Sequence, residues 1–219
     1  MGIKKKTNAV TVIMYLSELA SLGLFFFLFK EHMLVKWIYV FLAALLVSPI
    51  ISRFYCGWIC PIHTLMKVED FIYEKLHVKK LPTPKFMTNK FFRFLFLFLF
   101  IGTFIVTKML KIKVDVLLYA IGIALIVNLI FDGEFWHRYL CPYGSLLSLF
   151  SKKPALKLKI DESKCIGCGM CQRVCPTNTI VTLDNKKRRI ESVECLTCFE
   201  CQRVCPVEAI KYGSKEIKS

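Results

Sequence analysis

Two cysteine arrays near the C-terminal end carry the strongest chemical signal in the chain. Residues 165–176 read CIGCGMCQRVCP and residues 195–206 read CLTCFECQRVCP, so both follow the pattern C-x-x-C-x-x-C-x-x-x-C-P. Each iron of a [4Fe–4S] cubane needs one thiolate, and three cysteines spaced in this way can bind three corners from one tight loop. The cysteine before proline then ligates the other cluster. The arrays therefore predict two [4Fe–4S] clusters.

The predicted ligands cross between the two arrays. The first cluster is assigned Cys165, Cys168, Cys171 and Cys205, and the second is assigned Cys195, Cys198, Cys201 and Cys175. A structural zinc site needs four ligands and no such repeated array, so the pattern favours iron–sulfur clusters. Metal-bound thiolates also imply a reducing compartment.

The similarity of the two arrays extends beyond the cysteines. KIDESKC before the first array matches RIESVEC before the second, and TIVTL (179–183) matches AIKYG (209–213). We expect a strand, a cluster loop, a short helical turn and a strand, twice over. This is a bacterial-type 2[4Fe–4S] ferredoxin domain of the α+β class, at residues 155–219. Gly167 and Gly169 would let backbone N–H groups approach the cluster sulfurs.

Two earlier stretches each place a cysteine before a proline. Residues 56–61 read C-x-x-x-C-P and residues 137–142 read H-x-x-x-C-P. Proline favours the first position of a helix, so each cysteine is expected at a helix N-terminus, where the dipole and free N–H groups lower a thiol pKa. If the stretches meet, their four side chains suit an iron, copper or cluster site: Cys56, Cys60, His137 and Cys141. The alternative is two buried thiols, a capping cysteine and an interfacial histidine.

The elements that must position these motifs are long and apolar. The chain has 219 residues, of which 55% are hydrophobic, and its mean hydropathy is +0.51. Four segments are long enough to cross about 30 Å of hydrocarbon: residues 9–29, 34–51, 91–107 and 114–131. Short links join them in pairs. We therefore expect a mostly α chain built on a four-transmembrane-helix bundle, with two helical hairpins in a membrane domain at residues 9–150.

Positive charge predicts the orientation of these segments. The formal net charge is +15, and most Lys and Arg residues lie before the first segment, in the loop at residues 53–90, or after residue 131. The positive-inside rule then places the basic N-terminus (residues 1–8), the long loop and the ferredoxin domain on the cytoplasmic side of the cytoplasmic membrane. Because the charge flanks apolar segments, we expect no nucleic-acid partner. We also expect no cleavable signal peptide.

Several polar positions carry weaker predictions. Glu18 lies near the middle of the first apolar segment, where an ionisable group is by default a functional candidate. It could accept a proton from a quinol, or line a helix interface as a neutral acid. Asn128 is expected to bond to a neighbouring helix. Pro61 is expected to begin an amphipathic helix on the membrane surface. The run NKKRR (185–189) is expected at a hairpin tip, either solvated or docking an acidic partner.

The chain resembles the NapH/NosR-type membrane polyferredoxins over about residues 9–213. The resemblance rests on FYCGWICP, RYLCPYG and the two cysteine arrays. It implies four or more transmembrane helices, two cytoplasmic C-x-x-x-C-P motifs and a two-cluster ferredoxin, in proteins that pass electrons between quinones and periplasmic reductases or mature those reductases. Two positions depart from the family pattern, since His137 replaces a cysteine and His63 replaces a small residue. A histidine ligand would raise a cluster's potential; alternatively the second motif has lost its metal.

The expected function is that of a membrane-anchored electron-transfer subunit of an oxidoreductase complex. It would relay single electrons between two cytoplasmic [4Fe–4S] clusters and a membrane carrier, which is a quinone or a flavin, haem or cluster protein. NosR-like chains carry a periplasmic flavin-binding part that this sequence lacks, so a partner would supply it. One alternative is a metal-reduction or redox-enzyme maturation factor that uses Cys56, Cys60 and Cys141. Another is a non-catalytic anchor. No nucleotide-binding or hydrolytic motif is present.

Overall fold

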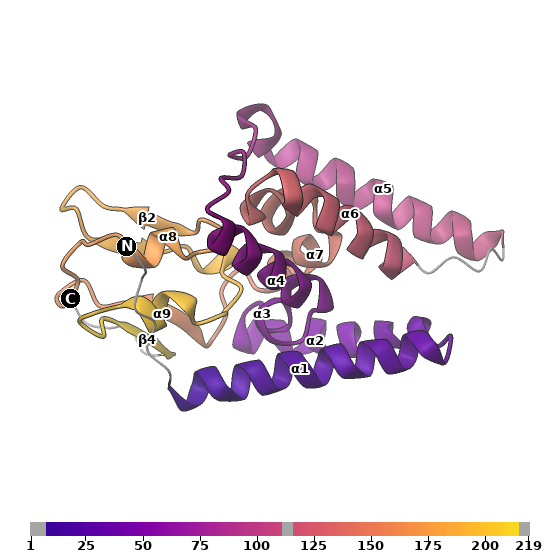
Figure 1. Ribbon diagram of the computed structural model, residues 1–219, viewed down its shortest axis with the longest axis horizontal. Coiled ribbons are helices and arrows are strands. Elements are labelled where there is room, and N and C mark those ends of the chain that lie inside the picture. The colour runs from indigo at the N-terminus through magenta and orange to yellow at the C-terminus, as the bar shows by residue number, and fades with distance from the viewer. Residues whose placement is uncertain (1–7, 111–115, 215–219) are drawn as a thin grey trace.

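A computed structural model of the protein describes residues 8–110 and 116–214, and Figure 1 shows a helical part joined to a smaller part with short strands. The predicted basic N-terminus lies almost wholly outside the described residues, and the start of the fourth apolar segment lies outside them too. The helical elements are α1 (Ala9–Lys30), η1 (Leu34–Lys36), α2 (Trp37–Ile51), α3 (Phe54–Trp58), α4 (Pro61–Leu76), η2 (Lys85–Thr88), α5 (Lys90–Met109), α6 (Val116–Ile130), the π-helical η3 (Phe135–Leu140) and α7 (Pro142–Phe150).

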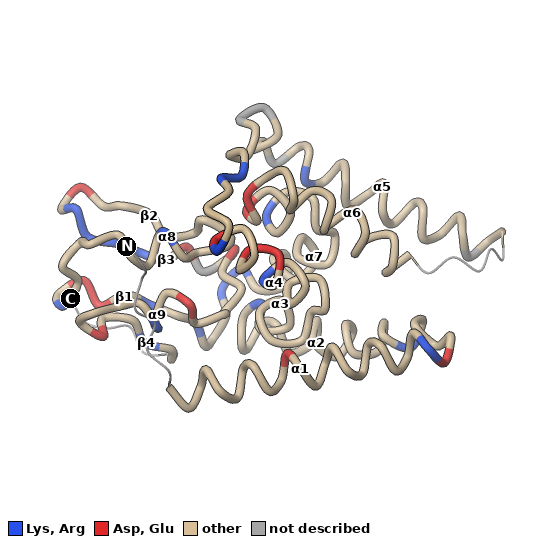
Figure 2. The backbone as a smooth tube through the Cα atoms, viewed as in Figure 1, with Lys and Arg blue, Asp and Glu red and all other residues tan. Residues whose placement is uncertain are grey.

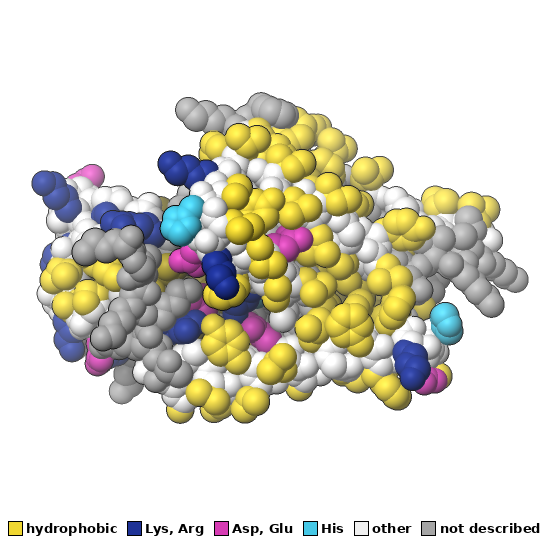
Figure 3. Space-filling view, viewed as in Figure 1, with side chains coloured by type: hydrophobic (Ala, Val, Ile, Leu, Met, Phe, Trp, Pro, Cys, Tyr) yellow, Lys and Arg dark blue, Asp and Glu magenta, His cyan; other side chains and the backbone are white. Residues whose placement is uncertain are grey.

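The four predicted apolar helices are present, but they differ in length. Among the described residues, Ala9–Lys30 and Leu34–Ile51 are long and apolar enough to cross a membrane, whereas Phe91–Thr107 and Val116–Ile130 are shorter apolar helices. Large apolar side chains cover the outer surface of these helices (Figure 3), and Leu46 of α2 is 80% exposed. Charged residues gather mainly in the smaller part and at its junction with the helices (Figure 2). A bundle of four transmembrane helices remains a prediction.

The helices that follow the two Cys-Pro stretches join the hairpins to each other. The α4 helix packs against α1 and α6, and α7 packs against α2 and α5. The short segments before them repeat this arrangement, because α3 contacts α1 and α2 while η3 contacts α5 and α6. The predicted amphipathic helix at Pro61 is therefore present as α4, whose buried face holds Ile62, His63 and Met66, while its place on a membrane surface remains a prediction. Asn128 of α6 donates to Glu69 Oε2 at 2.8 Å, which confirms its predicted bond to a neighbouring helix.

The smaller part has the predicted duplicated arrangement of strands and turns. Its elements are β1 (Lys157–Ile160), α8 (Met170–Arg173), β2 (Ile180–Thr182), β3 (Arg188–Ile190), η4 (Ser192–Glu194), α9 (Glu200–Val204) and β4 (Ile210–Gly213). The β1 strand pairs antiparallel with β4, with Ile160 opposite Ile210. The β2–β3 pair is a hairpin, and the NKKRR run lies at its tip as predicted: residues 185–187 are in the turn, and Arg188 and Arg189 begin β3.

The connection between the two parts is hydrogen-bonded to the end of α2. The backbone N–H groups of Ala155 and Leu156 donate to the carbonyls of Pro49 and Ile50 at 3.1 and 2.7 Å. These carbonyls belong to the last turn of α2, where a helix supplies no N–H donors for its own carbonyl groups. The two parts also share their cores, because Leu196 and Cys198 pack in the core of the helical part. The ferredoxin-type part is therefore held against the helices on several sides.

Candidate iron–sulfur centres

The four predicted ligands of the first cluster surround one small cavity. Cys165, Cys168, Cys171 and Cys205 all line it, together with Gly169. Gly167 and Gly169 have φ values of +71° and +73°. Glycine adopts such left-handed conformations at no steric cost. Burial raises the pKa of the Cys171 thiol to about 11, and the other three thiols of the set also interact with it electrostatically. The donor set and the cavity fit a [4Fe–4S] cluster, which would bring deprotonation of these thiols with it.

The second predicted set is more deeply buried. Cys198 and Cys201 are 8% and 7% exposed, and burial raises the pKa of both thiols. Both interact electrostatically with Cys195 and with Cys175 of the first array, as the crossed ligand assignment requires. Cys175 Sγ also lies 3.4 Å from the Thr179 hydroxyl. This donor set also fits a [4Fe–4S] cluster, whose potential such hydrogen bonds to sulfur tune.

The second array is seated directly on the first Cys-Pro stretch. Trp58 Nε1 donates to the carbonyl oxygen of Thr197 at 3.0 Å. A Cβ atom on Gly57 would collide with the Leu196 carbonyl and press on the backbone of Cys198, so glycine permits this close approach. The aromatic ring of Trp58 also packs edge-on against Phe199, with ring centroids 5.9 Å apart. The loop of the second array and the turn around Cys56 therefore form one packed unit.

A buried group of three charged side chains fixes the same junction. Arg53, which is 0% exposed, donates from Nη1 to Glu194 Oε2 at 2.7 Å. Arg93 pairs with the other carboxylate oxygen of Glu194 and donates from Nε to Ser145 Oγ at 3.1 Å. Glu194 immediately precedes Cys195, so the start of the second array is tied to α5, α7 and the first Cys-Pro stretch. Sequence reasoning missed these residues, because Arg53 and Glu194 are 141 positions apart.

The two Cys-Pro stretches meet, which is the condition on which the predicted third site depends. Cys56, Cys60 and Cys141 lie in one buried core, and Cys60 and Cys141 are the N-caps of α4 and α7. The Gly144 N–H donates to Cys141 Sγ at 3.4 Å. The expectation of low thiol pKa values is nevertheless wrong for the metal-free thiols. Burial raises the pKa of Cys141 to about 12, and it also raises that of Cys60 and Cys56. Desolvation therefore outweighs the effect of the helix N-terminus.

The imidazole of His137 contacts another histidine. His137 Nε2 lies 3.2 Å from His63 Nδ1, and the two rings are edge-on with centroids 5.0 Å apart. Burial lowers the pKa of His137 to about 3, so its ring is neutral. His63, which is 3% exposed, has no hydrogen-bond partner for Nε2 in the described chain. The structure thus joins His137 to a residue that the predicted third site did not include.

No group of three Cys, His, Asp or Glu side chains could hold a single metal ion in residues 8–110 and 116–214. This holds for both ferredoxin sets as well as for the Cys-Pro thiols. Ligands of one zinc ion lie only about 2.0–2.3 Å from the metal, whereas the ligands of a cubane bind four different irons.

Glu18 is buried at the contact between α1 and α4, not in an apolar setting. It is 4% exposed, and Lys67 Nζ donates to its two carboxylate oxygens at 2.7 and 3.1 Å. Lys67 also lies over the ring of Tyr15, and Tyr15 OH accepts a hydrogen bond from Arg203 at 2.8 Å. The expected interface role is present, but as an ion pair that links α1 and α4.

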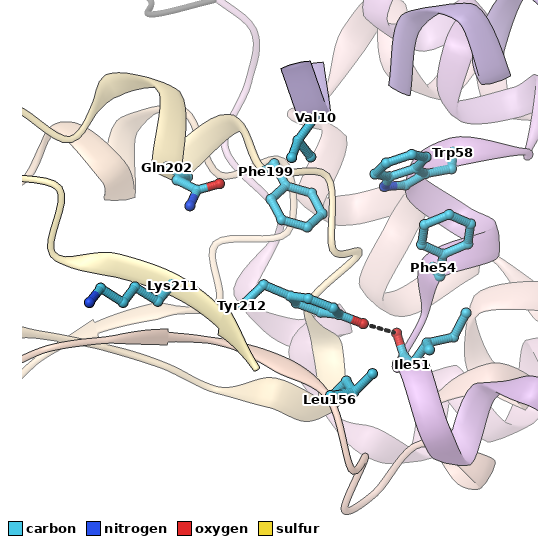
Figure 4. A pocket seen from close by; sticks show the side chains of 9 residues that line it. All are labelled: Val10, Ile51, Phe54, Trp58, Leu156, Phe199, Gln202, Lys211 and Tyr212. Atoms are coloured by element: carbon cyan, nitrogen blue, oxygen red, sulfur yellow. Dashed lines mark hydrogen bonds between the residues drawn. The ribbon is translucent and has the colours of Figure 1, made fainter. Parts of the chain in front are cut away.

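A pocket of about 570 Å³ lies between the helix ends and the second array (Figure 4). Trp58, Phe54 and Phe199 form much of its wall, and the Tyr212 hydroxyl donates to the Ile51 carbonyl at 3.4 Å. The remaining lining residues are Val10, Ile51, Leu156, Gln202 and Lys211. The pocket is thus mainly apolar and aromatic, with two polar side chains at the ferredoxin-type side (Figure 4).

Comparisons with known proteins define the class. Residues 157–206 match the family model described as a 4Fe-4S dicluster domain, and residues 34–84 and 114–161 match the model described as a 4Fe-4S binding domain. The second match covers the two Cys-Pro stretches in turn. The chain is therefore an iron–sulfur protein of the ferredoxin type. No solved structure matches the chain.

Its relatives narrow the class to a family. The uncharacterized protein MJ0750 of Methanocaldococcus jannaschii is 30% identical over 84% of this chain and 87% of its own length. MJ0749 of the same organism is 36% identical over 64% of this chain, and the putative electron transport protein YccM of Escherichia coli is 26% identical over 62%. Further relatives are named ferredoxin-type proteins NapH and MauN. The chain belongs to the NapH-type polyferredoxin family, and its role is in electron transfer.

This chain matches only part of the length of some of these relatives. The matched region spans 57% of MJ0749 and 44% of YccM. Activities and partners of the whole relatives therefore come to this chain as proposals.

Proposed function

We propose that this protein is a membrane-anchored electron-transfer subunit that relays single electrons between a partner on the ferredoxin side and a carrier in the bilayer. The first array would hold the outer cluster and the second array the inner one, with the ligands assigned above. The observation that carries this order is the seating of the second array on Gly57 and Trp58, while Cys168 of the first array is exposed.

The anchoring part of the proposal is supported by the outer surface of the helices. An apolar surface of this extent is rare on soluble monomers and is typical of contact with lipid or protein. We propose that all four apolar helices enter the cytoplasmic membrane, with α5 and α6 shorter in their apolar length than α1 and α2. The ferredoxin domain and both termini would face the cytoplasm, in agreement with the distribution of Lys and Arg.

The chain's own residues would insulate and orient the centres. The clusters supply one-electron chemistry when they are bound. Trp58, Phe199 and Leu196 exclude water from the inner side of the second array, which lowers the solvent reorganisation needed there. The exposed side chains of Lys186 in the β2–β3 turn and Arg189 in β3 lie on the first-array half and suit an acidic redox partner. One of these, Arg189, is already paired with Glu162 at 2.8 Å, so the attraction would be modest.

The carrier that we propose is a quinone bound in the pocket lined by Trp58 and Phe199. The volume of this pocket is about 570 Å³. Small-molecule sites usually enclose roughly 300–1000 Å³, so the pocket is of suitable size. It borders both the helix ends and the second array, so a ligand with an apolar tail could reach it from the bilayer. Gln202 and Lys211 would offer polar contacts to the head group.

Proteoliposomes would test this function directly. The anaerobically purified chain is reconstituted, its clusters are reduced with dithionite, and excess reductant is removed before a lipid-soluble quinone is added to the bilayer. We expect reoxidation of both cluster signals, and we expect Val10→Trp, which narrows the pocket, to slow it. Leu46→Trp, on the exposed surface of α2, is the matched control. Clusters that stay reduced in the presence of quinone would refute the quinone carrier, and absence of cluster signals would refute the relay as a whole.

The maturation alternative gains less support from the geometry. A factor that delivers a metal ion must release it, but Cys56, Cys60 and Cys141 are only 5%, 6% and 5% exposed. Such burial is better suited to a resident centre.

A further inference from the structure

The two Cys-Pro stretches carry their histidines at different positions, and these two histidines meet in space. The stretches read C-x-x-x-C-P-x-H and H-x-x-x-C-P-x-G, so Cys56 corresponds to His137 and His63 corresponds to Gly144. The surrounding helices repeat the same contacts in both halves. His63 of the first stretch lies 3.2 Å from His137 of the second. The extra histidine of one stretch therefore contacts the position at which the other lacks a cysteine.

The position equivalent to His63 in the second stretch is Gly144, and its surroundings are different. A Cβ on Gly144 would collide with the guanidinium of Arg53, and this guanidinium interacts electrostatically with the Cys56 thiol. The counterpart of Arg53 in the second stretch is Glu134, which instead pairs with Arg138 at 3.3 Å. One side of the centre thus has a thiol beside a cation, and the other has two imidazoles.

One ring nitrogen of His63 has no hydrogen-bond partner among the described residues. Its Nε2 is buried and has no hydrogen-bond partner there. A buried polar atom without a partner is destabilising, and it calls for an unseen water or ion. If Nδ1–H of His63 donates to His137 Nε2, then His63 Nε2 presents its lone pair. Metal-bound histidines have this arrangement, because their second nitrogen donates to an outer group.

We propose that His63 is the nitrogen ligand of a third iron–sulfur cluster held by Cys56, Cys60 and Cys141, and that His137 positions His63 instead of binding iron. The three thiols lie in one buried core, and His63 lies three residues after Cys60, in the first turn of α4. This inference rests on the proposed function, since the third centre would lie between the second array and the bilayer. An imidazole ligand raises the potential of a cluster above that of its all-thiolate form.

Pulsed electron paramagnetic resonance on the full chain labelled with 15N-histidine tests the assignment. We expect iron and sulfide in excess of two cubanes and a 15N coupling on the third signal. In His63→Cys the excess iron should remain, the coupling should vanish and the potential should fall. In His137→Asn the coupling should persist, while the affinity for the third cluster falls by about 10–100-fold, as for outer partners of metal-bound histidines. The control is His77→Gly, at the exposed left-handed C-cap of α4, which should change nothing.

The outcomes separate this inference from the proposed function. Loss of the coupling in His137→Asn together with its retention in His63→Cys would assign iron ligation to His137 and overturn the proposal. Iron for two cubanes alone would also overturn it, yet the ferredoxin clusters and their reoxidation by quinone would leave the relay standing. The signals of the two ferredoxin clusters report folding in every variant, so a variant that loses them is replaced by His63→Gly, the residue found at position 144.

Discussion

The two cysteine loops of the ferredoxin part have nearly the same sequence pattern but very different surroundings. Gly167 and Gly169 supply the left-handed conformations of the first loop, whereas Thr197 and Phe199 adopt them in the second with φ values of +55° and +56°. A left-handed conformation at residues other than glycine costs of order 1–3 kcal/mol and persists where the surroundings impose it. Here the surroundings are Trp58 and the turn around Gly57.

The difference shows which loop is built for contact inside the molecule. The first loop keeps its shape by local backbone freedom and leaves Cys168 exposed. The second loop keeps its shape by tertiary contacts, through Trp58, Arg53 and Arg93. One cysteine pattern therefore serves an outward-facing site and an inward-facing site, and the difference lies in residues between the cysteines.

The largest test removes the buried anchor of the second loop. We expect Glu194→Ala to destabilise the holoprotein by about 3–5 kcal/mol, because Arg53 is left as a buried unpaired charge. Glu162→Ala is the matched control on the first-loop side, where Glu162 pairs with the exposed Arg189. Such a surface pair is worth about 0–1 kcal/mol. Thermal unfolding midpoints in detergent measure both. Equal effects would show that the two loops are anchored alike.

Crowding the junction should have a smaller effect. The Cβ of Gly57→Ala would press on the backbone around Leu196, which has little room to move. We expect this overpacking to cost about 1–3 kcal/mol and to weaken the second cluster's signal. In Gly133→Ala the new Cβ meets the Pro176 carbonyl at an ordinary 3.6 Å, so little change is expected. If Gly57→Ala left the signal of the second cluster unchanged, the close packing of the second array against Gly57 would be wrong.

Solvent access should distinguish the clusters without any mutation. Because Cys168 is exposed while Cys198 and Cys201 are buried, a chelator with mild oxidant should remove the first cluster before the second. The measurement is the time course of the two paramagnetic signals after re-reduction. Loss of both in a single phase would mean that burial does not protect the inner loop.

The smallest expected effect comes from exchanging glycine and non-glycine residues at the left-handed positions of the two loops. Thr197→Gly should stabilise the protein by at most about 1 kcal/mol, because relief of the left-handed conformation is partly offset by the flexibility of glycine. It also removes a buried hydroxyl without a partner in the described chain. Gly167→Ala should act in the opposite direction, because alanine disfavours the left-handed conformation by about 1–2 kcal/mol and its Cβ would also press on the Lys186 carbonyl. If both variants shifted the thermal unfolding midpoint in the same direction, the proposed difference between the two loops would be wrong.

Sequence predicted the features that depend on local pattern. The strands around Ile160 and Ile190 follow from the repeated sequence pattern, and the helices that begin at Pro61 and Pro142 follow from the preference of proline for a first turn. The shared context of the two Cys-Pro stretches made their meeting a possibility, but it did not predict it. Each of these signals lies within a short window of the chain.

Features that depend on desolvation or on distant pairing were not predictable. The thiol pKa of Cys60 reflects burial among side chains from several helices, and spacing does not report burial. The pairing of Arg53 with Glu194 and of His63 with His137 joins residues far apart in the sequence. One clue was present for His63, because it stands where the second stretch has glycine.

The hydrogen bonds from Ala155 and Leu156 to the last turn of α2 have a kinetic consequence. A ferredoxin domain on a loose tether can swing like an arm between donor and acceptor, and its reach then limits turnover. Here the connecting segment is hydrogen-bonded to α2, so the distances between the proposed clusters would be fixed when the protein folds. Turnover would then depend on how often a redox partner binds at the first array. Lengthening the segment around Ala155 and Leu156 would slow electron transfer from the first cluster to the second array and the membrane carrier.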